Sequence, residues 1–267
     1  RLGAFGKRVI EAEPGLRVIA RHGAGYDNID VEAAKQAGIW VTFDPVSNGN
    51  AVAEHCIALL LACGKNLPVM DRAVRSGNFA VRNRRPTMEL SGKVLGIAGF
   101  GRIGRLVAQK AGDGLGMEIA AYDPYVKELP EEFQSYVTLC GENEVISGCD
   151  FLSLHLPLND ETRNMISAPQ LASMKAGAYV INAARGGIVN EKDLYEALVS
   201  GHIAGAAMDV SEVEPMAKEN PLRTLDNVII TPHIGMYSKE AIGAVSLICA
   251  QNVAACAAGA ELKFQVV

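Results

Sequence analysis

The chain has 267 residues, of which 49% are apolar, and carries a formal net charge of −5. This length is enough for one large α/β domain or for two smaller domains that each bury a core. The composition argues against a nucleic-acid surface, because no basic stretch is combined with stacking aromatic residues. We also expect no membrane segment, since no charge-free apolar run approaches the ~20 residues that a span needs.

Apolar, β-rich segments alternate with helical patterns along most of the chain. Several of the strand-like segments are continuously apolar, which is typical of a parallel sheet covered on both faces. Helix-like segments cover residues 102–110 and 191–200, and this alternation predicts an α/β fold with right-handed crossovers. The predicted strands are residues 17–21, 40–42, 94–98, 118–122, 151–154, 179–182, 205–210 and 228–231.

Two long apolar helices, at about residues 51–63 and 239–258, stand apart from this alternation. We interpret them as connectors between a central domain and an outer domain that is split in the sequence. The predicted division assigns residues 1–66 and 236–267 to the outer domain and residues 67–235 to the central one. We expect the cleft between the two domains to hold the ligands.

The six cysteines are interpreted as core residues. None forms a C-x-x-C pair, so we expect no metal site. Cys56 and Cys63, like Cys249 and Cys256, are seven residues apart in helix-like runs, which is the spacing of one buried face. Small apolar cysteines of this kind are typical of a protein in the reducing cytoplasm.

The strongest local pattern is a glycine motif, Gly99-Phe100-Gly101-Arg102-Ile103-Gly104, between a predicted strand and a predicted helix. Gly99 permits a tight turn, Gly101 lets a pyrophosphate approach the backbone, and Gly104 lets helix and strand pack closely. The free N–H groups and positive dipole end of the helix would then meet the phosphates. This context predicts a dinucleotide-binding Rossmann domain.

The next strand ends at Asp123-Pro124, 19 residues after Gly104, where such domains place a ribose-binding acid. A carboxylate there accepts hydrogen bonds from the ribose hydroxyls and repels a 2′-phosphate. The predicted cofactor is therefore NAD rather than NADP.

Polar residues follow four other predicted strands, where the carboxyl ends of parallel strands gather ligands. Reduction of a 2-oxo acid needs a group that holds the carboxylate, and the planar fork of Arg185 is suited to this. It also needs a proton donor, for which His233 is the natural candidate, with Glu214 as the carboxylate that orients it. In the reverse direction His233 would act as the base.

The sequence resembles the D-isomer-specific 2-hydroxyacid dehydrogenases, a family that includes phosphoglycerate, lactate and glyoxylate or hydroxypyruvate enzymes. The resemblance runs from about Gly15 to the C-terminus. Besides the glycine motif, it is carried by residues 21–30 (RHGAGYDNID), 52–55 (VAEH), 182–187 (NAARGG), 214–215 (EP) and 232–235 (PHIG).

The resemblance implies a function and a set of site residues. The implied reaction is hydride transfer between NAD(H) and a small D-2-hydroxy acid or 2-oxo acid, with Arg185, Glu214 and His233 as the catalytic triad. Backbone amides near Gly23, Ala24 and Gly25, together with Arg185 and His233, would bind the substrate. The expected cofactor contacts are Val52, Gly99, Gly101, Arg102, Ile103, Gly104, Asp123, Pro124, His155, Leu156, Pro157, Ala183, Ala184, Arg185, Asp209, His233 and Gly235.

The resemblance further implies a homodimer and an outer domain of the flavodoxin-like α/β type, from which the opening strand and helix are expected to be missing. Met236 stands where many relatives have Gly or Ala, and Phe79 stands where many relatives have Trp. An alternative function is NAD(H) sensing without metabolism, as in a corepressor, which the triad alone does not exclude. Formate dehydrogenase is disfavoured, because it pairs its histidine with Gln where this chain has Glu214.

Overall fold

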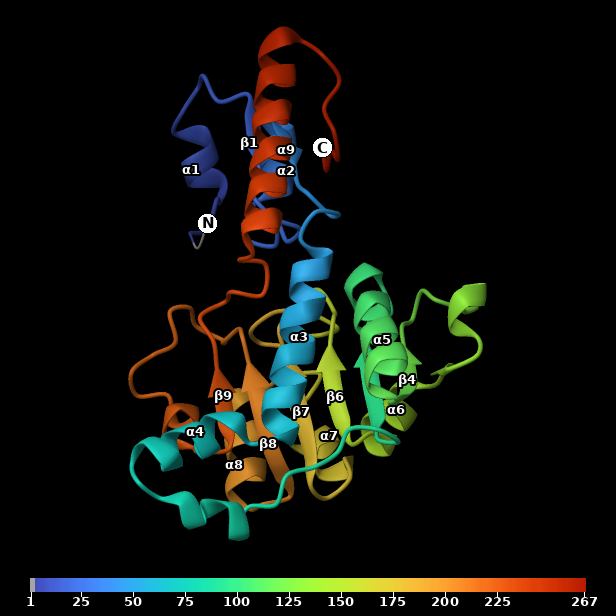
Figure 1. Ribbon diagram of the computed structural model, residues 1–267. Helices are drawn as coiled ribbons and strands as arrows, with labels where there is room; N and C mark the ends of the chain where they lie inside the picture. Colours follow the sequence, from blue (N-terminus) through green and yellow to red (C-terminus); the bar gives the residue numbers. More distant parts are fainter. Residues whose placement is uncertain (1–2) are drawn as a thin grey trace. The chain divides into compact units, whose positions relative to one another are not determined.

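The computed structural model describes residues 3–267, which divide into two compact units (Figure 1). One unit comprises the chain up to residue 51 together with residues 236–267, and the other comprises residues 52–235. The boundary before Met236 coincides with the predicted one. The other boundary lies near the start of helix α3 (Gly49–Gly64), whereas the division predicted from the sequence lies after the end of this helix.

The larger unit contains a parallel seven-stranded sheet in the order β5-β4-β3-β6-β7-β8-β9. The order reverses between β3 and β6, which is the doubly wound arrangement predicted from the sequence. Such sheets bind ligands beyond the carboxyl ends of their strands, next to this reversal. The strands are β3 (Val94–Ala98), β4 (Glu118–Tyr122), β5 (Val137–Leu139), β6 (Phe151–Leu154), β7 (Ala178–Asn182), β8 (Ile203–Met208) and β9 (Val228–Ile230).

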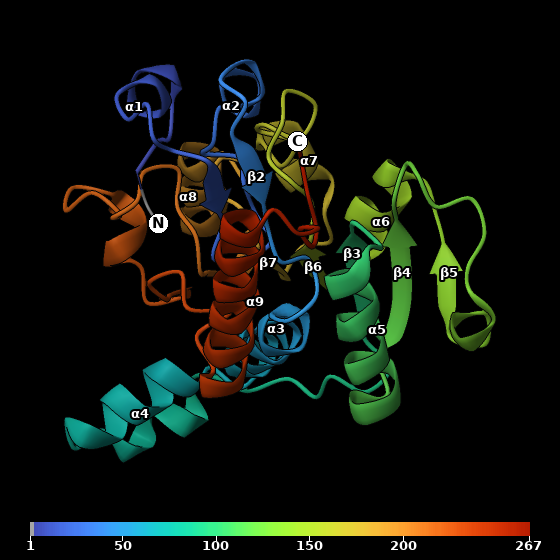
Figure 2. The same ribbon diagram turned by 90° about the horizontal axis from the view of Figure 1, so that it is seen from above.

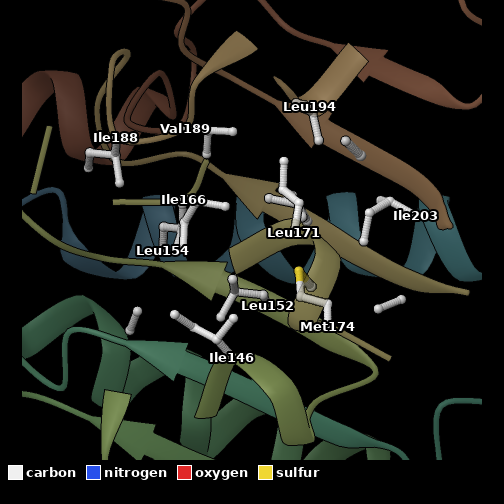
Figure 3. Close-up of a cluster of buried hydrophobic side chains, with 14 of the residues drawn as sticks. Ile146, Leu152, Leu154, Ile166, Leu171, Met174, Ile188, Val189, Leu194 and Ile203 are labelled. Atoms are coloured by element: carbon white, nitrogen blue, oxygen red, sulfur yellow. The ribbon is translucent and has the colours of Figure 1, made fainter. Parts of the chain in front are cut away.

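Helices cover both faces of this sheet (Figure 2). Helices α3 and α5 (Arg102–Leu115) lie on one face, and α6 (Glu142–Gly148), α7 (Ala168–Ser173) and α8 (Glu191–Val199) lie on the other. The second layer closes over a buried apolar cluster that includes Leu152, Leu171 and Leu194 (Figure 3). Burying each such side chain stabilises the fold by ~1.5–3 kcal/mol, so this layer holds the strand ends in place.

The sequence analysis did not predict every element of the larger unit. Besides β5, α6 and α7, the structure contains helix α4 (Leu67–Arg75) and three 3₁₀ helices, η1 (Phe79–Asn83), η2 (Glu131–Phe133) and η3 (Pro221–Thr224). These elements are short, and within α4 and η1 no residue is buried. Periodicity in so few residues is too weak to identify them.

The smaller unit has two parallel strands, β1 (Val18–Ala20) and β2 (Trp40–Thr42), with helices α1 (Lys7–Glu11), α2 (Val31–Gln36) and α9 (Lys239–Ala258). Its core is a separate buried cluster of Ile10, Ile29, Ala33, Ala34, Ile39 and Val41. Each unit therefore has a core of its own.

Helix α9 corrects one expectation. We predicted no apolar run of membrane-spanning length, yet an 18-residue window of this 20-residue helix has a mean hydropathy of 1.7, and the helix is long and apolar enough to cross a bilayer by length and composition. The expectation failed because, after Lys239 and Glu240 in the first turn, the polar residues of the helix carry no charge and leave the mean hydropathy of the following segment high. One of them, Asn252, is buried and bonds both the N–H (2.8 Å) and the carbonyl (3.1 Å) of Lys263. Core helices of soluble proteins meet the same criterion, so α9 alone assigns no membrane role.

Candidate active site

The predicted catalytic residues follow neighbouring strands of the larger sheet. Arg185 follows β7, Glu214 lies in the loop after β8, and His233 follows β9. The three strands are parallel and adjacent, so their carboxyl ends share one edge of the sheet. The polar residues are separated in the sequence because each crossover returns the chain to the opposite edge before the next strand begins.

His233 and Glu214 form a direct hydrogen-bonded pair. Nδ1 of His233 lies 2.7 Å from Oε2 of Glu214, which confirms the contact predicted from the sequence. Both side chains are partly exposed, at 32% and 23%. A carboxylate at Nδ1 fixes the orientation of the imidazole and leaves Nε2 to face a substrate, which is the arrangement that an acid–base histidine needs.

The backbone around His233 is held firmly in an unusual conformation. His233 has a φ of +55°, in the left-handed region that non-glycine residues seldom adopt. Its N–H donates to the carbonyl of Asp209 at 2.8 Å, in the loop that follows β8. Such strain persists where surrounding contacts over-determine it, and it is concentrated at functional sites.

Asp209 supplies most of those contacts. Its buried carboxylate accepts hydrogen bonds from the Thr231 hydroxyl (2.6 Å) and from the N–H groups of Ile234 (2.9 Å) and Gly235 (2.8 Å). Burial by itself would raise the pKa of Asp209, but hydrogen bonds from His55, Thr231 and these amides outweigh it and lower the pKa below its ordinary value. Asp209 is therefore an anion that organises the loop carrying His233.

His55 contacts Asp209, and the sequence analysis did not predict this contact. It lies within helix α3, and its Nε2 lies 3.3 Å from Oδ1 of Asp209 and 3.2 Å from the Thr231 hydroxyl. Val52 lies one turn earlier on α3, and a Cβ added at Gly235 would lie 3.7 Å from its side chain. Its place in the segment 52–55, which carries part of the family resemblance and includes the predicted site residue Val52, was a signal that could have identified His55.

The loop after β7 is shaped by its own side chains. The Asn182 amide donates to the carbonyl of Arg185 at 2.9 Å, and its oxygen accepts the N–H of Ala184 at 3.1 Å. Nη1 of Arg185 donates to the Ala184 carbonyl at 2.7 Å. The predicted cofactor contact Ala183 lies between these residues, so the turn that carries Arg185 is built by hydrogen bonds from Asn182, at the end of β7.

The glycine motif has the geometry that a dinucleotide requires. Gly99 has a φ of +96°, and a Cβ there would lie 2.6 Å from the carbonyl oxygen of His155. A Cβ at Gly104 would lie 2.1 Å from the carbonyl oxygen of Gly99, whereas one at Gly101 would meet nothing within 4 Å. Gly101 is the N-cap of α5 and has no side-chain cap, so the first turn at Arg102 and Ile103 offers its amides to a ligand.

Asp123 occupies the end of β4, next to this turn. Its carboxylate accepts the N–H groups of Phe100 and Tyr125, both at 2.9 Å. Each carboxylate oxygen has a second lone pair for a ribose hydroxyl. Together with Pro124, which follows it, Asp123 fits an adenosine ribose, and the residues present therefore fit NAD.

The turn after β6 lies against the glycine motif. A Cβ added at Gly99 would lie 3.1 Å from the side chain of Leu156. The carbonyl of Pro157 accepts a hydrogen bond from the Thr162 hydroxyl at 2.6 Å. The ring of His155 lies 2.9 Å from the Ser153 hydroxyl, and burial lowers its pKa from 6.5 to about 4. His155 is consequently a neutral residue of the fold at pH 7.

This burial predicts an acid-sensitive contribution to stability. Because the folded-state pKa of His155 lies below the unfolded value of 6.5, its contribution is complete above pH 6.5 and is lost as the pH falls towards 4. Between pH 8 and pH 5 the free energy of unfolding should fall by about 2 kcal/mol more in the wild type than in His155→Gln. Urea unfolding of both proteins at the two pH values measures the difference, and equal losses would show that His155 is not the responsible group.

The predicted carboxylate-binding residues Gly23, Ala24 and Gly25 lie in the smaller unit, in the loop after β1. Gly23 has a φ of +128°, and a Cβ there would lie 3.5 Å from the sulfur of Met236. The guanidinium of Arg21 donates to the carbonyl of Gly25 at 2.5 Å. The loop is thus fixed by its own unit, and a side chain at Gly23 would be strained.

Two further properties of residues 3–267 bear on the chemistry. The six cysteines are all free thiols in this part of the chain, and burial raises the pKa of Cys56, Cys63 and Cys149 to about 12. Within the same residues, no group of three or more His, Cys, Asp and Glu side chains is placed to hold a metal ion.

Comparison with known proteins gives consistent results. Residues 57–235 match the family model described as D-isomer specific 2-hydroxyacid dehydrogenase, NAD binding domain. The chain is 44% identical to D-3-phosphoglycerate dehydrogenase of Methanocaldococcus jannaschii over 92% of its own length and 46% of that protein. It is 43% identical to hydroxypyruvate reductase of Thermotoga maritima over 87% of its length and 75% of that protein.

Among solved structures, a glyoxylate reductase from Paecilomyes thermophila superimposes with a TM-score of 0.87 at 35% identity, covering 99% of this chain and 79% of that one. The chain spans about half the length of the phosphoglycerate dehydrogenases that it matches.

Proposed function

The chain belongs to the D-isomer specific 2-hydroxyacid dehydrogenase family and contains its NAD binding domain, and we propose that it transfers a hydride between NAD(H) and a small D-2-hydroxy acid or 2-oxo acid. The observation that carries this proposal is the 2.7 Å contact between Nδ1 of His233 and Glu214. Because Nδ1 is bonded to Glu214, the other ring nitrogen of His233, Nε2, is the one that can transfer a proton to and from a substrate.

The proposed roles follow from the chemistry of reduction. When bound, NADH supplies the hydride that C2 of the 2-oxo acid accepts. His233 gives a proton from Nε2 to the carbonyl oxygen, and Glu214 stabilises the imidazolium before the transfer. Arg185 binds the substrate carboxylate through its fork, aided by backbone amides near Gly23, Ala24 and Gly25. In the oxidation direction His233 takes the proton back.

We propose that the cofactor lies along the carboxyl edge of the larger sheet. The amides of the α5 first turn would bind the pyrophosphate, Asp123 the ribose, and Asp209 the nicotinamide carboxamide. The remaining proposed contacts are Val52, Pro124, His155, Leu156, Pro157, Ala183, Ala184 and Gly235.

Replacing Asp123 with serine should weaken NADH binding and relax the preference for NADH over NADPH. The carboxylate accepts ribose hydrogen bonds in NADH and repels the 2′-phosphate of NADPH, and serine removes the repulsion while keeping a hydroxyl. Dissociation constants of both cofactors, from quenching of protein fluorescence, measure the change. Equal affinity of the wild type for the two cofactors would contradict the role of Asp123.

A panel of 2-oxo acids with NADH, followed by absorbance of the nicotinamide, tests the proposed activity. The names of the relatives place glyoxylate, hydroxypyruvate and phosphohydroxypyruvate first in that panel. Turnover of any of them supports the proposal. NADH binding without turnover across the panel would instead support the NAD(H)-sensing alternative.

We also propose a cytoplasmic homodimer, by resemblance to the family. Light scattering on the purified protein measures its mass in solution, and a mass of one chain would contradict the dimer.

A further inference from the structure

The loops that carry Arg185 and Glu214 are in direct backbone contact. A Cβ at Gly186, the residue after Arg185, would lie 1.8 Å from the carbonyl oxygen of Ser211 and 2.9 Å from the backbone nitrogen of Glu212. Only glycine permits this approach. The contact lies three residues before Glu214, so whatever holds it also governs the distance between the two proposed site residues.

Two glutamates close this contact in a reciprocal arrangement. The N–H of Glu212 donates to Oε1 of Glu191 at 2.7 Å, and the N–H of Glu191 donates to Oε1 of Glu212 at 2.9 Å. Glu191 is the first residue of α8 and is only 9% exposed. Hydrogen bonds between carboxylates and amides are charge-assisted, and removing one partner leaves a buried group unsatisfied.

Asn220 anchors the far end of the same loop. Its amide nitrogen donates to Oε2 of Glu191 at 2.5 Å, and its oxygen caps η3 through the N–H of Leu222 at 3.0 Å. The carboxylate of Glu191 therefore holds residues 212 and 220 together, with Glu214 between them. At the start of this closed loop, the N–H of the preceding residue, Ser211, donates to Oε1 of Glu214 at 3.3 Å, which orients the carboxylate that contacts His233.

We propose that Glu191 and Glu212 are positioning residues that fix the Glu214 loop against the Arg185 loop. The inference rests on the proposed function, because it assigns no contact with substrate or cofactor to either glutamate. The pair holds the acid–base unit of His233 and Glu214 at the distance from Arg185 that a 2-oxo acid requires. A displacement of ~1 Å in such a constellation costs on the order of 10²-fold in rate.

The test compares Glu191→Ala with Glu191→Gln, Glu212→Ala, the double alanine variant and the control Glu196→Ala. Glu196 lies on the same helix with its side chain 64% exposed. We expect Glu191→Ala to lower kcat/KM for the 2-oxo acid by about 10–100-fold, mainly through kcat, with the dissociation constant of NADH unchanged. Glu191→Gln should reverse part of the loss, because its carbonyl oxygen still accepts the N–H of Glu212 while its NH2 group cannot accept from the amide of Asn220. Glu196→Ala should match the wild type.

The two alanine variants should not be additive. Each removes one side of the same reciprocal contact, so the double variant should lose little more than either single one. Additive losses would show that the two glutamates act independently and would contradict the proposal. If Glu191→Ala does not fold, Glu212→Ala removes the contact from the other side and gives the same test.

Amide hydrogen exchange supplies a readout that needs no activity. Peptides covering residues 211–220 should exchange faster in Glu191→Ala than in the wild type, while peptides from α5 remain unchanged. Unchanged exchange in 211–220, or a loss of kcat/KM that Glu191→Gln does not reverse, would overturn the positioning role. A wild type without turnover would defeat the proposed function instead, and the exchange measurement would still decide whether the glutamates hold the loop.

Discussion

Replacing His233 with alanine is expected to lower turnover of the 2-oxo acid by about 10²–10⁴-fold, the usual contribution of general acid–base catalysis. The substrate oxygen develops negative charge as hydride arrives at C2, and without the imidazole only water can protonate it. NADH should still bind, because the glycine turn and Asp123 lie on other strands. Stopped-flow turnover and fluorescence titration with NADH measure the two effects separately.

His202→Ala is the matched control for this experiment. His202 precedes β8, at the opposite end of the strand that leads to Asp209. Its replacement should leave kcat/KM close to the wild-type value. Near-normal turnover in His233→Ala would remove this residue from the mechanism, and the contact with Glu214 would then be an ion pair of the fold alone.

Replacing Arg185 with alanine is expected to lower kcat/KM on the order of 10²–10⁴-fold, because the fork donates two hydrogen bonds to a charged group worth about 1.5–3 kcal/mol each. The loss should appear in both kcat and KM, since the carboxylate is held in the ground state and in the transition state. Arg185→Lys should recover only part of the activity, because an ammonium group keeps the charge but not the planar fork.

The exposed Arg223, in η3, provides a matched control for the loss of one positive charge. Arg223→Ala should retain normal kcat and KM. If Arg185→Ala and Arg223→Ala weakened substrate binding equally, general attraction between the protein and an anion would explain both losses, and Arg185 would have no specific role in the site.

The strands at the centre of the larger sheet could be predicted to the residue. Strands β3 and β6 begin and end where the apolar pattern does, because continuous burial demands an uninterrupted apolar run. Strand β4 also has its predicted bounds, although Glu118 at its start is exposed. The pattern is weaker at β5, whose central Thr138 is exposed, and that edge strand was missed. Helix α5 continues to Leu115, past the predicted end at Lys110, and stops at Gly116 with a φ of +64°.

The sequence by itself determined the α/β class, the glycine turn and the residues that follow each strand, because these depend on short segments of chain. It also identified His233 and Glu214 as a pair, which the structure places 2.7 Å apart. Only the tertiary structure brought His55 to Asp209 and Glu191 to Glu212. Those contacts join separate elements at distances of about 3 Å, and no periodicity records them. They depend on the positions of the helices on the sheet, and side-chain packing across the whole unit determines those positions.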